Sequence, residues 1–319
     1  MTGKFDPSAL SEYVFSRTGA GNDGLLVGPG YAEDAAAVET EGGTLVVSTD
    51  PISLAAERIG TLAVDVASND VAASGGDPTW LVSTVFLPAR DEALLDEITD
   101  QLDAEADRLG ISIVGGHTES VAALDRPLLS LTCFGPADRY VPTSGASPGD
   151  AVLLTKGAGV EATAVLATDF RDAIDRPADV LDRAAAFFED LSVVPEAAAL
   201  SPFASAMHDP TEGGILAGLV ELARASEVRL AVEEDAVPVR EETRALCDAM
   251  GVDPLRVLGS GALLATVPAD ALDDAQAALE RAGVDAAVVG RVEEGTPGVA
   301  LDGEVYADAV ADEMWALWD

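Results

Sequence analysis

The stretch LAVDVASNDVAASGG, residues 62–76, sets three oxygen-bearing side chains among small apolar residues. Its alanines and valines predict a buried helix over residues 55–74, because a surface helix would show a wide charged face. Asp65 and Asn69 lie four positions apart and share a face, whereas Asp70 points about 100° further round. Burying an unpaired carboxylate costs several kcal/mol, so these side chains require a cation or hydrogen-bond partners.

The elements predicted around this helix indicate an α/β protein of the α+β kind, mixed within each half. In the first half we expect strands at 44–50, 80–88, 111–116 (buried) and 128–135, and a helix at 91–110. In the second half we expect strands at 151–157, 229–235, 259–268 and 286–292, and helices at 160–169, 178–191 and 269–282, with another ending near 225. The segment PTSGASPGD, 142–150, is dense in Pro, Ser and Gly, and predicts a boundary between domains 1–145 and 146–319.

The charge of the chain is strongly negative. Its 319 residues include 57 Asp and Glu against 18 Lys and Arg, a net charge of −39, and its lysines are Lys4 and Lys156 alone. Because 48% of the residues are hydrophobic and the acids are evenly spread, this composition favours a folded protein of a salt-accumulating organism over a disordered chain. It disfavours nucleic acid and anionic membranes as partners. With no signal peptide and no long apolar run, we expect a soluble, cytoplasmic protein.

Two short motifs upstream of the helix supply further oxygen ligands. EDAAAV, 33–38, places Glu33 and Asp34 after a glycine-rich stretch, and STDP, 48–51, places Thr49 and Asp50 at the end of a strand. Ligands often sit at strand ends in α/β sheets, although an Asp before Pro also fits a simple turn. Magnesium takes oxygen ligands and is usually shared between one or two carboxylates and the phosphates of a substrate. The acids therefore predict a binding site for a metal-bound nucleotide.

Two glycine-containing motifs bring other polar groups. In VGGHTES, 114–120, Gly115 and Gly116 allow close backbone approach to a ligand beside His117 and Thr118, or form only a tight turn. LLTKG, 153–157, places Lys156 at a strand end in a chain that avoids lysine, which suggests a specific contact.

The motif MHDPTEGG, 207–214, has two interpretations that can hold together. Asp209, Pro210 and Glu212 fit the N-cap, N1 and N3 positions of a helix. Gly213 and Gly214 in the first turn cost about 1 kcal/mol each, however, which favours an anion site or a close backbone approach.

Taken in order, EDAAAV, STDP, NDVAASGGDP, VGGHTE, LLTKG, HDPTEGG and GSGALL resemble the aminoimidazole ribonucleotide (AIR) synthetase superfamily over nearly the whole chain. This superfamily includes selenophosphate synthetase, thiamine-monophosphate kinase and the hydrogenase maturation protein HypE, and the nearest resemblance is to HypE-like proteins of archaea. It implies a two-domain PurM-like fold with a C-terminal α/β domain, and a homodimer whose N-terminal sheets pair into a barrel next to ATP.

The resemblance also implies roles for individual positions. Magnesium ligands are expected at Asp34, Asp50, Asp70 and Asp209, with Glu33 and Asp65 as further metal or supporting residues. Nucleotide contacts are expected at Thr49, Asn69, Gly115, Gly116, Thr118 and Gly213. Lys156 or His117 would contact phosphate or the acceptor as the catalytic groups.

The sequence departs from its relatives on the acceptor side. HypE acts on a cysteine at its own C-terminus, whereas this sequence ends EMWALWD, so we expect no dehydration of a thiocarboxamide on its own tail. Selenophosphate synthetase uses an N-terminal cysteine or selenocysteine beside a lysine, and SRTGAGND offers neither. Cys133 and Cys247 lie in apolar segments and fit small core residues.

Three functions remain from the sequence alone. The first is an enzyme that uses ATP and magnesium to activate an oxygen of an unidentified small-molecule or protein acceptor by phosphoryl transfer. The second is a non-catalytic homodimer that senses nucleotide or binds a maturation partner. The third is a salt-adapted protein whose acids bind nothing, which leaves the acids in Ala- and Val-rich segments unexplained.

Overall fold

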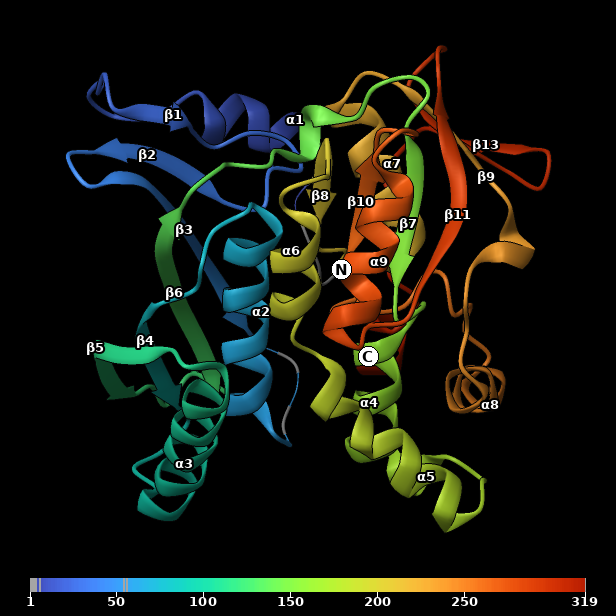
Figure 1. Cartoon of the computed structure of the whole chain (residues 1–319). Coiled ribbons are helices and arrows are strands. Elements are labelled where there is room, and N and C mark those ends of the chain that lie inside the picture. The colour runs from blue at the N-terminus through green and yellow to red at the C-terminus, as the bar shows by residue number, and fades with distance from the viewer. Residues whose placement is uncertain (1–4, 6, 54, 56, 319) are drawn as a thin grey trace.

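The computed structural model describes residues 5, 7–53, 55 and 57–318. The N-terminal half forms a six-stranded sheet in the order β1-β2-β3-β6-β4-β5 (Figure 1). Neighbouring strands are antiparallel except β4 and β5, which are parallel. The strands are β1 Leu25–Val27, β2 Ala36–Thr40, β3 Gly43–Ile52, β4 Trp80–Leu87, β5 Ser112–Ser120 and β6 Leu128–Ala137. The helices of this half are α1 Pro7–Leu10, α2 Ile59–Ala73 and α3 Glu92–Leu109.

One face of this sheet packs against α2 and α3. Val64 and Val71 of α2 share a core with Leu81 of β4, Leu131 of β6 and Ile98 of α3. The Asp91 carboxylate caps α3 by accepting the N–H groups of residues 93 and 94. Alternate side chains of β4 and β6 therefore point toward the helices and are buried.

The opposite face of the sheet remains open to contact. Phe86, Phe134 and Val82 are half-buried there, and Trp80 is exposed, with its ring 5.6 Å from that of Phe134. Within the described residues the outer strands β1 and β5 do not pair with each other, so the single chain contains no closed barrel.

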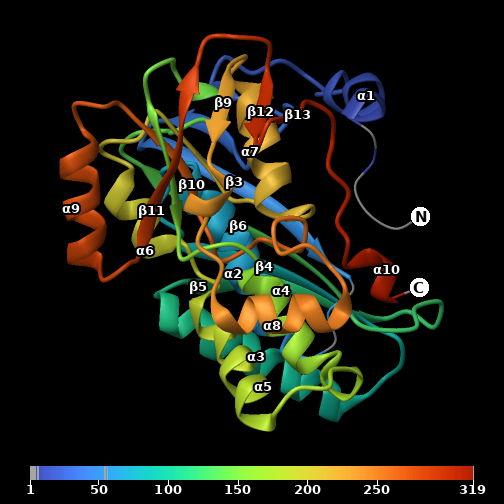
Figure 2. The same cartoon turned by 90° about the vertical axis from the view of Figure 1, so that its right-hand side faces the viewer.

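The C-terminal half forms a seven-stranded sheet in the order β13-β12-β9-β11-β7-β10-β8. Its strands are β7 Ala151–Thr155, β8 Ala206–His208, β9 Arg229–Val232, β10 Leu264–Val267, β11 Ala286–Glu293, β12 Gly298–Leu301 and β13 Glu304–Tyr306. Its helices are α4 Val160–Thr168, α5 Ala178–Ala185, α6 Val194–Leu200, α7 Gly214–Ala225, α8 Glu241–Met250, α9 Leu272–Ala282 and α10 Trp315–Trp318. In Figure 2, α10 and α1 lie on the same side of the molecule.

Helix α2 joins the two halves. Every residue from Ile59 to Ala73 is buried, as the composition of the segment predicts. Its Val64 and Val71 belong to the N-terminal core, its Leu62 and Val66 pack in a cluster with α4, and Ala72 and Ala73 pack in another with α6. Figure 1 accordingly shows α2 between the six-stranded sheet and the C-terminal elements.

The expected strands correspond to the central strands of both sheets, β3, β4 and β6 in one and β7, β9, β10 and β11 in the other. The sequence did not predict β1, β2, β8, β12, β13, α6 or α8, and two expectations need correction. Residues 111–116 were expected to form a buried strand; Ile111 is buried and precedes β5, but 112–116 belong to β5, which is exposed along its whole length and continues through Ser120. The helix expected to begin near Pro210 begins at Gly214 instead, so Asp209 does not cap it. The boundary between 1–145 and 146–319 stays a prediction.

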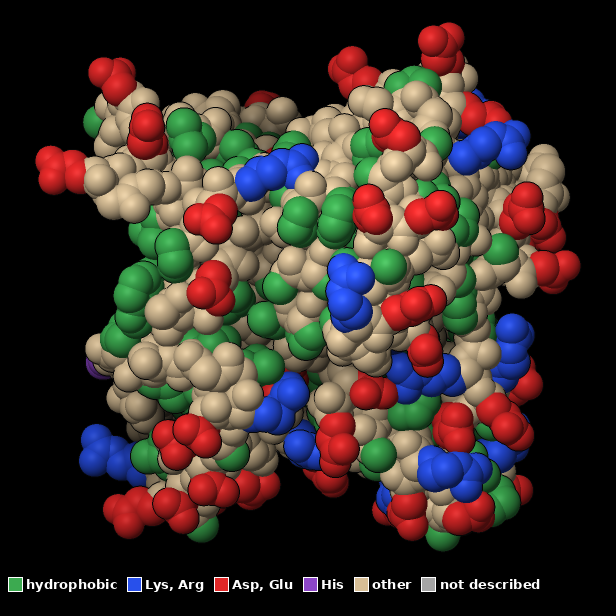
Figure 3. Space-filling model, in the orientation of Figure 1, with side chains coloured by type: hydrophobic (Ala, Val, Ile, Leu, Met, Phe, Trp, Pro, Cys, Tyr) green, Lys and Arg blue, Asp and Glu red, His purple; other side chains and the backbone are tan. Residues whose placement is uncertain are grey.

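The surface agrees with an even distribution of charge. Asp and Glu side chains are scattered over the face that Figure 3 shows and do not gather in a single patch. Within the described ranges, no helix has both the length and the apolar character needed to cross a membrane.

Candidate functional site

A cavity of about 990 Å³ lies where the two halves meet. Strand β3 and helix α2 supply its wall on the N-terminal side, and α4 and the segment after β8 supply its wall on the C-terminal side. Residues 309–312 and α10 also line it, together with α7, residues 30–34 and the N-terminal residues Phe5, Pro7, Leu10 and Phe15.

Folding gathers four aspartates at this cavity from distant parts of the sequence. Asp34 precedes β2, Asp50 lies in β3, Asp70 lies in α2 and Asp209 follows β8. The backbone N–H of Asp209 donates to Oδ2 of Asp34 at 3.2 Å. Asp50 lies close enough to Asp70 to raise the pKa of that carboxyl. Ser48, also in β3, donates to Oδ2 of Asp70 at 2.6 Å.

His208 connects this cluster to α7. Its Nδ1 lies 2.7 Å from Oδ1 of Asp34, and its Nε2 lies 3.0 Å from Oε2 of Glu221. Burial by itself would lower the pKa of His208, but the two carboxylates raise it to about 10. The imidazolium therefore carries a positive charge between two acids that belong to different halves of the chain.

The remaining acids are held in an environment that disfavours their charge. Burial raises the pKa of Asp70 and of Asp209 well above the usual range, and the neighbouring aspartates raise it further. Burial also raises the pKa of Asp34, although His208 opposes that effect. A bound cation would remove the repulsion that these shifts reflect.

The cluster fits a hard dication such as Mg²⁺. Neither carboxylate oxygen of Asp209 has a hydrogen-bond partner among the described residues, although both oxygens are buried. Among the described residues, no group of three His, Cys, Asp or Glu side chains is arranged to hold a metal ion by itself. Because Mg²⁺ commonly takes one or two carboxylates and completes its shell with phosphate and water oxygens, this oxygen-only set suits a metal that arrives with a ligand.

Asp65 does not join the cluster. It lies on the other side of α2, where Oδ1 is 3.5 Å from Nη2 of Arg108, and Arg108 is also hydrogen-bonded to Glu105 of α3. Burial raises the pKa of Asp65 well above the usual range, and the nearby Glu105 raises it further. This side chain belongs to an ion-pair network between α2 and α3.

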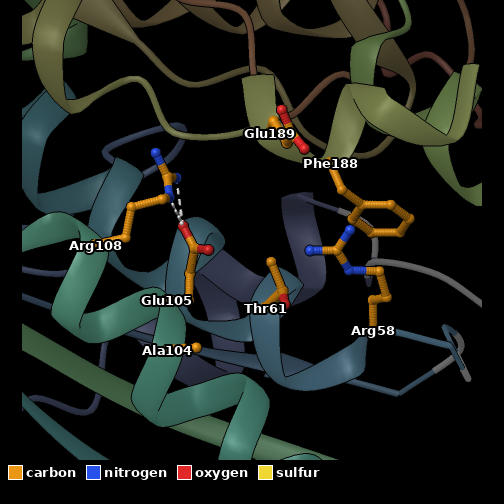
Figure 4. Close-up of a pocket in the computed structure, with 7 residues that line it drawn as sticks. All are labelled: Arg58, Thr61, Ala104, Glu105, Arg108, Phe188 and Glu189. Carbon is orange, nitrogen blue, oxygen red and sulfur yellow. Dashed lines mark hydrogen bonds and ion pairs between the residues drawn. The ribbon is translucent and has the colours of Figure 1, made fainter. Parts of the chain in front are cut away.

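A smaller cavity of about 480 Å³ opens beside this network (Figure 4). Arg58 and Arg108 flank it, and the guanidinium of Arg58 lies 4.9 Å from the centre of the Phe188 ring. Asp65 does not line it.

Asn69 and Lys156 lie away from the aspartates, and Asn69 bonds across the two halves whereas Lys156 bonds within the C-terminal half. The Asn69 amide donates to the carbonyl of Leu191 at 2.9 Å and accepts the N–H of Val193 at 2.8 Å. Lys156 donates to the carbonyls of Asp190 and Ser192, and its Nζ lies 2.8 Å from Oε1 of the buried Glu196. Neither residue lines the large cavity.

The residues predicted in VGGHTES also lie away from the cavity. Gly115, Gly116, His117 and Thr118 follow one another along the exposed strand β5. A Cβ at Gly116 would meet the carbonyl oxygen of Ser83 at 2.3 Å, so the glycine here permits the close pairing of β4 with β5.

The other predicted positions are at or near the cavity. Thr49 lines its edge and donates to the carbonyl of Leu131. Glu33 lines it too, but accepts hydrogen bonds from Tyr140 and Ser144.

Backbone contacts constrain the glycine pair at the start of α7. Gly213 has φ of 80°, and its N–H donates to Asp312 at 2.7 Å. Gly214 has φ of 64°, and a Cβ there would meet the carbonyl of Val257 at 2.5 Å. Close backbone approach therefore explains the pair.

The cavity residues that escaped the sequence prediction include Ser48, His208, Glu161 and Asp312. Ser48 and His208 stand inside the motifs STDP and MHDPTEGG, next to aspartates that were selected. Glu161 is a single acid in the apolar segment GVEATAVLA, which is the same signal that marked α2. Asp312 carried no comparable signal, because many acids surround it in the sequence.

Comparison with known proteins assigns both halves of the chain. Residues 32–137 match the AIR synthase related protein N-terminal domain, and residues 147–302 match the C-terminal domain of the same family. "Carbamoyl dehydratase HypE" of Rhizobium leguminosarum bv. viciae is 32% identical over 85% of this chain and 79% of its own length. "Selenide, water dikinase" of Geobacter metallireducens is 34% identical over 74% of this chain and 69% of its own length.

A solved structure of hydrogenase maturation protein HypE in complex with ATP shares the fold. It has a TM-score of 0.72 and 24% identity, and the match covers 96% of this chain and 94% of that one. The sequence relatives include bacterial HypE proteins and an archaeal hydrogenase expression/formation protein. The superfamily predicted from the motif order is thereby confirmed: this chain belongs to the AIR synthase related family.

Proposed function

We propose that this protein is an ATP- and magnesium-dependent enzyme that activates an oxygen of an acceptor by phosphoryl transfer. The observation that carries the proposal is the gathering of Asp34, Asp50, Asp70 and Asp209 at one cavity, with both buried oxygens of Asp209 unsatisfied among the described residues. The relatives named above as a dikinase and a dehydratase, and the HypE structure with ATP, support the same reaction class.

In this proposal the four aspartates hold magnesium, which supplies neutralising charge at the phosphates when it is bound. His208 opposes the rise in the pKa of Asp34 and fixes the orientation of that carboxyl, and Ser48 fixes the orientation of Asp70 through one hydrogen bond. The walls of the cavity exclude bulk water from the acids. Both cysteines are buried, and burial raises their thiol pKa to about 12, so neither supplies a nucleophile.

We propose further that two copies of the chain associate through the open face of the N-terminal sheet. That face exposes Trp80 beside half-buried Phe134, and the adjoining edge strand β5 exposes Val114. A second copy would cover these apolar groups. It would also bring the predicted nucleotide contacts Gly115, Gly116 and Thr118 next to a neighbouring chain, which accounts for their distance from their own cavity.

A non-catalytic nucleotide sensor is the second candidate. It is favoured by one observation: neither predicted catalytic residue, Lys156 or His117, lines the cavity. Steady release of phosphate from ATP with any acceptor would support the enzyme, whereas tight ATP binding without turnover would support the sensor.

Equilibrium dialysis of ATP at high salt, with Mg²⁺ or with EDTA, tests the proposal. We expect Mg²⁺ to strengthen ATP binding, and Asp209→Asn to remove most of that gain. The control is Asp100→Asn, which neutralises an exposed acid on α3. ATP binding that is equal with and without Mg²⁺, and unchanged in Asp209→Asn, would contradict the proposal.

A further inference from the structure

On three separate elements, the side chains that line the large cavity change between polar or acidic and apolar along one face. On one face of β3, Ser48 and Asp50 are followed by Ile52. On one face of α2, Leu62 and Val66 are followed by Asp70.

Helix α4 repeats this arrangement from the C-terminal side. Glu161 and Val165 lie four positions apart, so they share a face, and both line the cavity. Glu161 is close enough to Asp209 to raise the pKa of that carboxyl. The cavity therefore has an acid end, at the aspartates, and an apolar end.

The apolar end is one continuous surface. Leu62, Val66 and Val165 belong to a single hydrophobic cluster with Leu258, and the half-buried rings of Trp315 and Trp318 pack against it. These side chains line a space that the described residues do not fill. The acceptor in the proposed reaction has to occupy space adjoining the aspartates, and the apolar end offers that space.

The charge of the lining restricts the acceptor further. The lining contains nine Asp and Glu but, among the described residues, no Lys or Arg. Its one basic side chain is His208, which is already held between Asp34 and Glu221. Lys4 lies outside the described residues. Magnesium would offset the four aspartates, but the other five acids of the lining would still repel an anionic acceptor, and no Lys or Arg in the described lining opposes them.

Glu161 is the acid best placed to meet the acceptor. It is buried where the acid end joins the apolar end, and it is not among the four aspartates assigned to magnesium. Asp312 and Glu212 add negative charge near it. The aromatic faces of Trp315 and Trp318 also favour a cation over an anion.

We infer that the acceptor is an organic cation with an apolar body, which seats that body against Val66, Val165 and Trp315 and its positive group toward Glu161. This inference rests on the proposed phosphoryl-transfer function, because it identifies the class of molecule that receives the phosphoryl group. It excludes acceptors that carry a phosphate or carboxylate.

Three probes of one shape and different charge test the inference: 2-phenylethylamine, 2-phenylethanol and phenylacetate. Their dissociation constants are measured by ligand-observed NMR at high salt, with and without a non-hydrolysable ATP analogue and Mg²⁺. We expect the amine to bind at least tenfold more tightly than phenylacetate, with the alcohol between them. Phenylacetate binding as tightly as the amine would overturn the inference.

Variants separate the site from the general negative field of the chain. Glu161→Gln should reduce the preference for amine over alcohol about tenfold, and Glu161→Asp should retain it. Trp315→Ala should weaken the amine and the alcohol alike, and the exposed control Asp100→Asn should change neither. An amine preference that persists in a folded Glu161→Gln protein would also overturn the inference.

The two proposals fail in different ways. Loss of Mg²⁺-dependent ATP binding contradicts the reaction, whatever the probes do. Equal binding of the three probes, in a protein that does bind ATP with Mg²⁺, contradicts only the class of acceptor.

Discussion

At the scale of single residues, the site is built from acids whose burial is tolerated only because other groups compensate for it. His208 illustrates this for Asp34. It supplies the positive charge that favours the ionised form of Asp34 at 7% side-chain exposure, against the effect of burial, and it extends the contact to Glu221 on α7. Removing one partner of such a network leaves uncompensated charge in a low-dielectric environment, which costs more than the network itself contributes.

We therefore predict that His208→Asn destabilises the metal-free protein by about 3 kcal/mol, since Asp34 and Glu221 lose their shared cation. The matched control is the other histidine of the chain, because His117 is 65% exposed on β5. His117→Asn should stay within about 0.5 kcal/mol of the parent. Denaturant unfolding at constant salt measures both free energies, and equal losses in the two variants would contradict the assignment.

Glu161 leads to a prediction about pH. Burial raises its pKa from 4.5 to about 7. Because the folded-state pKa is the higher one, the associated stability is fully present below about pH 4.5 and is lost as the pH rises through about 7. Glu161→Gln should therefore raise the unfolding free energy at pH 8 by up to about 3 kcal/mol and flatten its decline between pH 5 and 8. Thermal unfolding across this range checks the result, and a Glu161→Gln protein with the parent's pH profile would refute it.

At the scale of elements, α2 is the helix that connects the hydrophobic cores of the two halves. Its apolar residues enter three cores, Asp70 reaches the aspartate cluster, and Asn69 bonds the loop of Leu191 and Val193. A helix with this many partners has no solvent face, which explains why its composition is apolar all round.

Asn69→Ala should destabilise the protein by about 2–4 kcal/mol, because it leaves the carbonyl of Leu191 and the N–H of Val193 buried without partners. The chain has one other asparagine, Asn22, in an exposed turn where it accepts the N–H of Gly24. Asn22→Ala should cost less than about 1 kcal/mol. Denaturant unfolding of the two variants measures both losses. A loss in Asn69→Ala no larger than that in Asn22→Ala would contradict the bridging role of Asn69.

The elements also show where sequence reasoning succeeds and where it stops. Apolar periodicity located α2, α3 and the central strands of both sheets, because burial is the dominant constraint on those residues. It misjudged β5, since ISIVGG looks like a buried strand in one dimension but residues 112–116 lie on an exposed edge. It also misplaced the start of α7, where capping chemistry at Asp209 competed with backbone contacts of Gly213 and Gly214.

The same contrast holds for the candidate site. The four aspartates were expected as a set because the order of motifs resembles the AIR synthetase superfamily, and Asp34 and Asp70 also stand out as acids beside Ala and Val. The fold brings all four to one cavity. Asp65 shares that signal with Asp70, but its position on the helix turns it toward Arg108. Lys156 and Asn69 stood out for their residue types, and only three-dimensional contacts show that Asn69 bridges the two halves while Lys156 bonds within the C-terminal half.

At the scale of the whole molecule, the open sheet face governs association. If two copies pair there, Phe134→Glu should convert a dimer to a monomer, because it places a charge in the middle of the half-buried apolar face. Val305→Glu introduces the same charge at a 56% exposed position of the C-terminal sheet and should leave the mass unchanged. Light scattering at high salt measures both, and a monomeric parent protein would rule out this dimer.

The central position of α2 also determines how the chain responds to being cut. A protease that nicks the connection at residues 142–150 severs one covalent link, but α2 remains enclosed by side chains from both fragments. The fragments should therefore co-elute under native conditions and separate only in denaturant, and neither should refold alone. Although two family domains can be recognised along the sequence, the molecule would then behave as one indivisible cooperative unit.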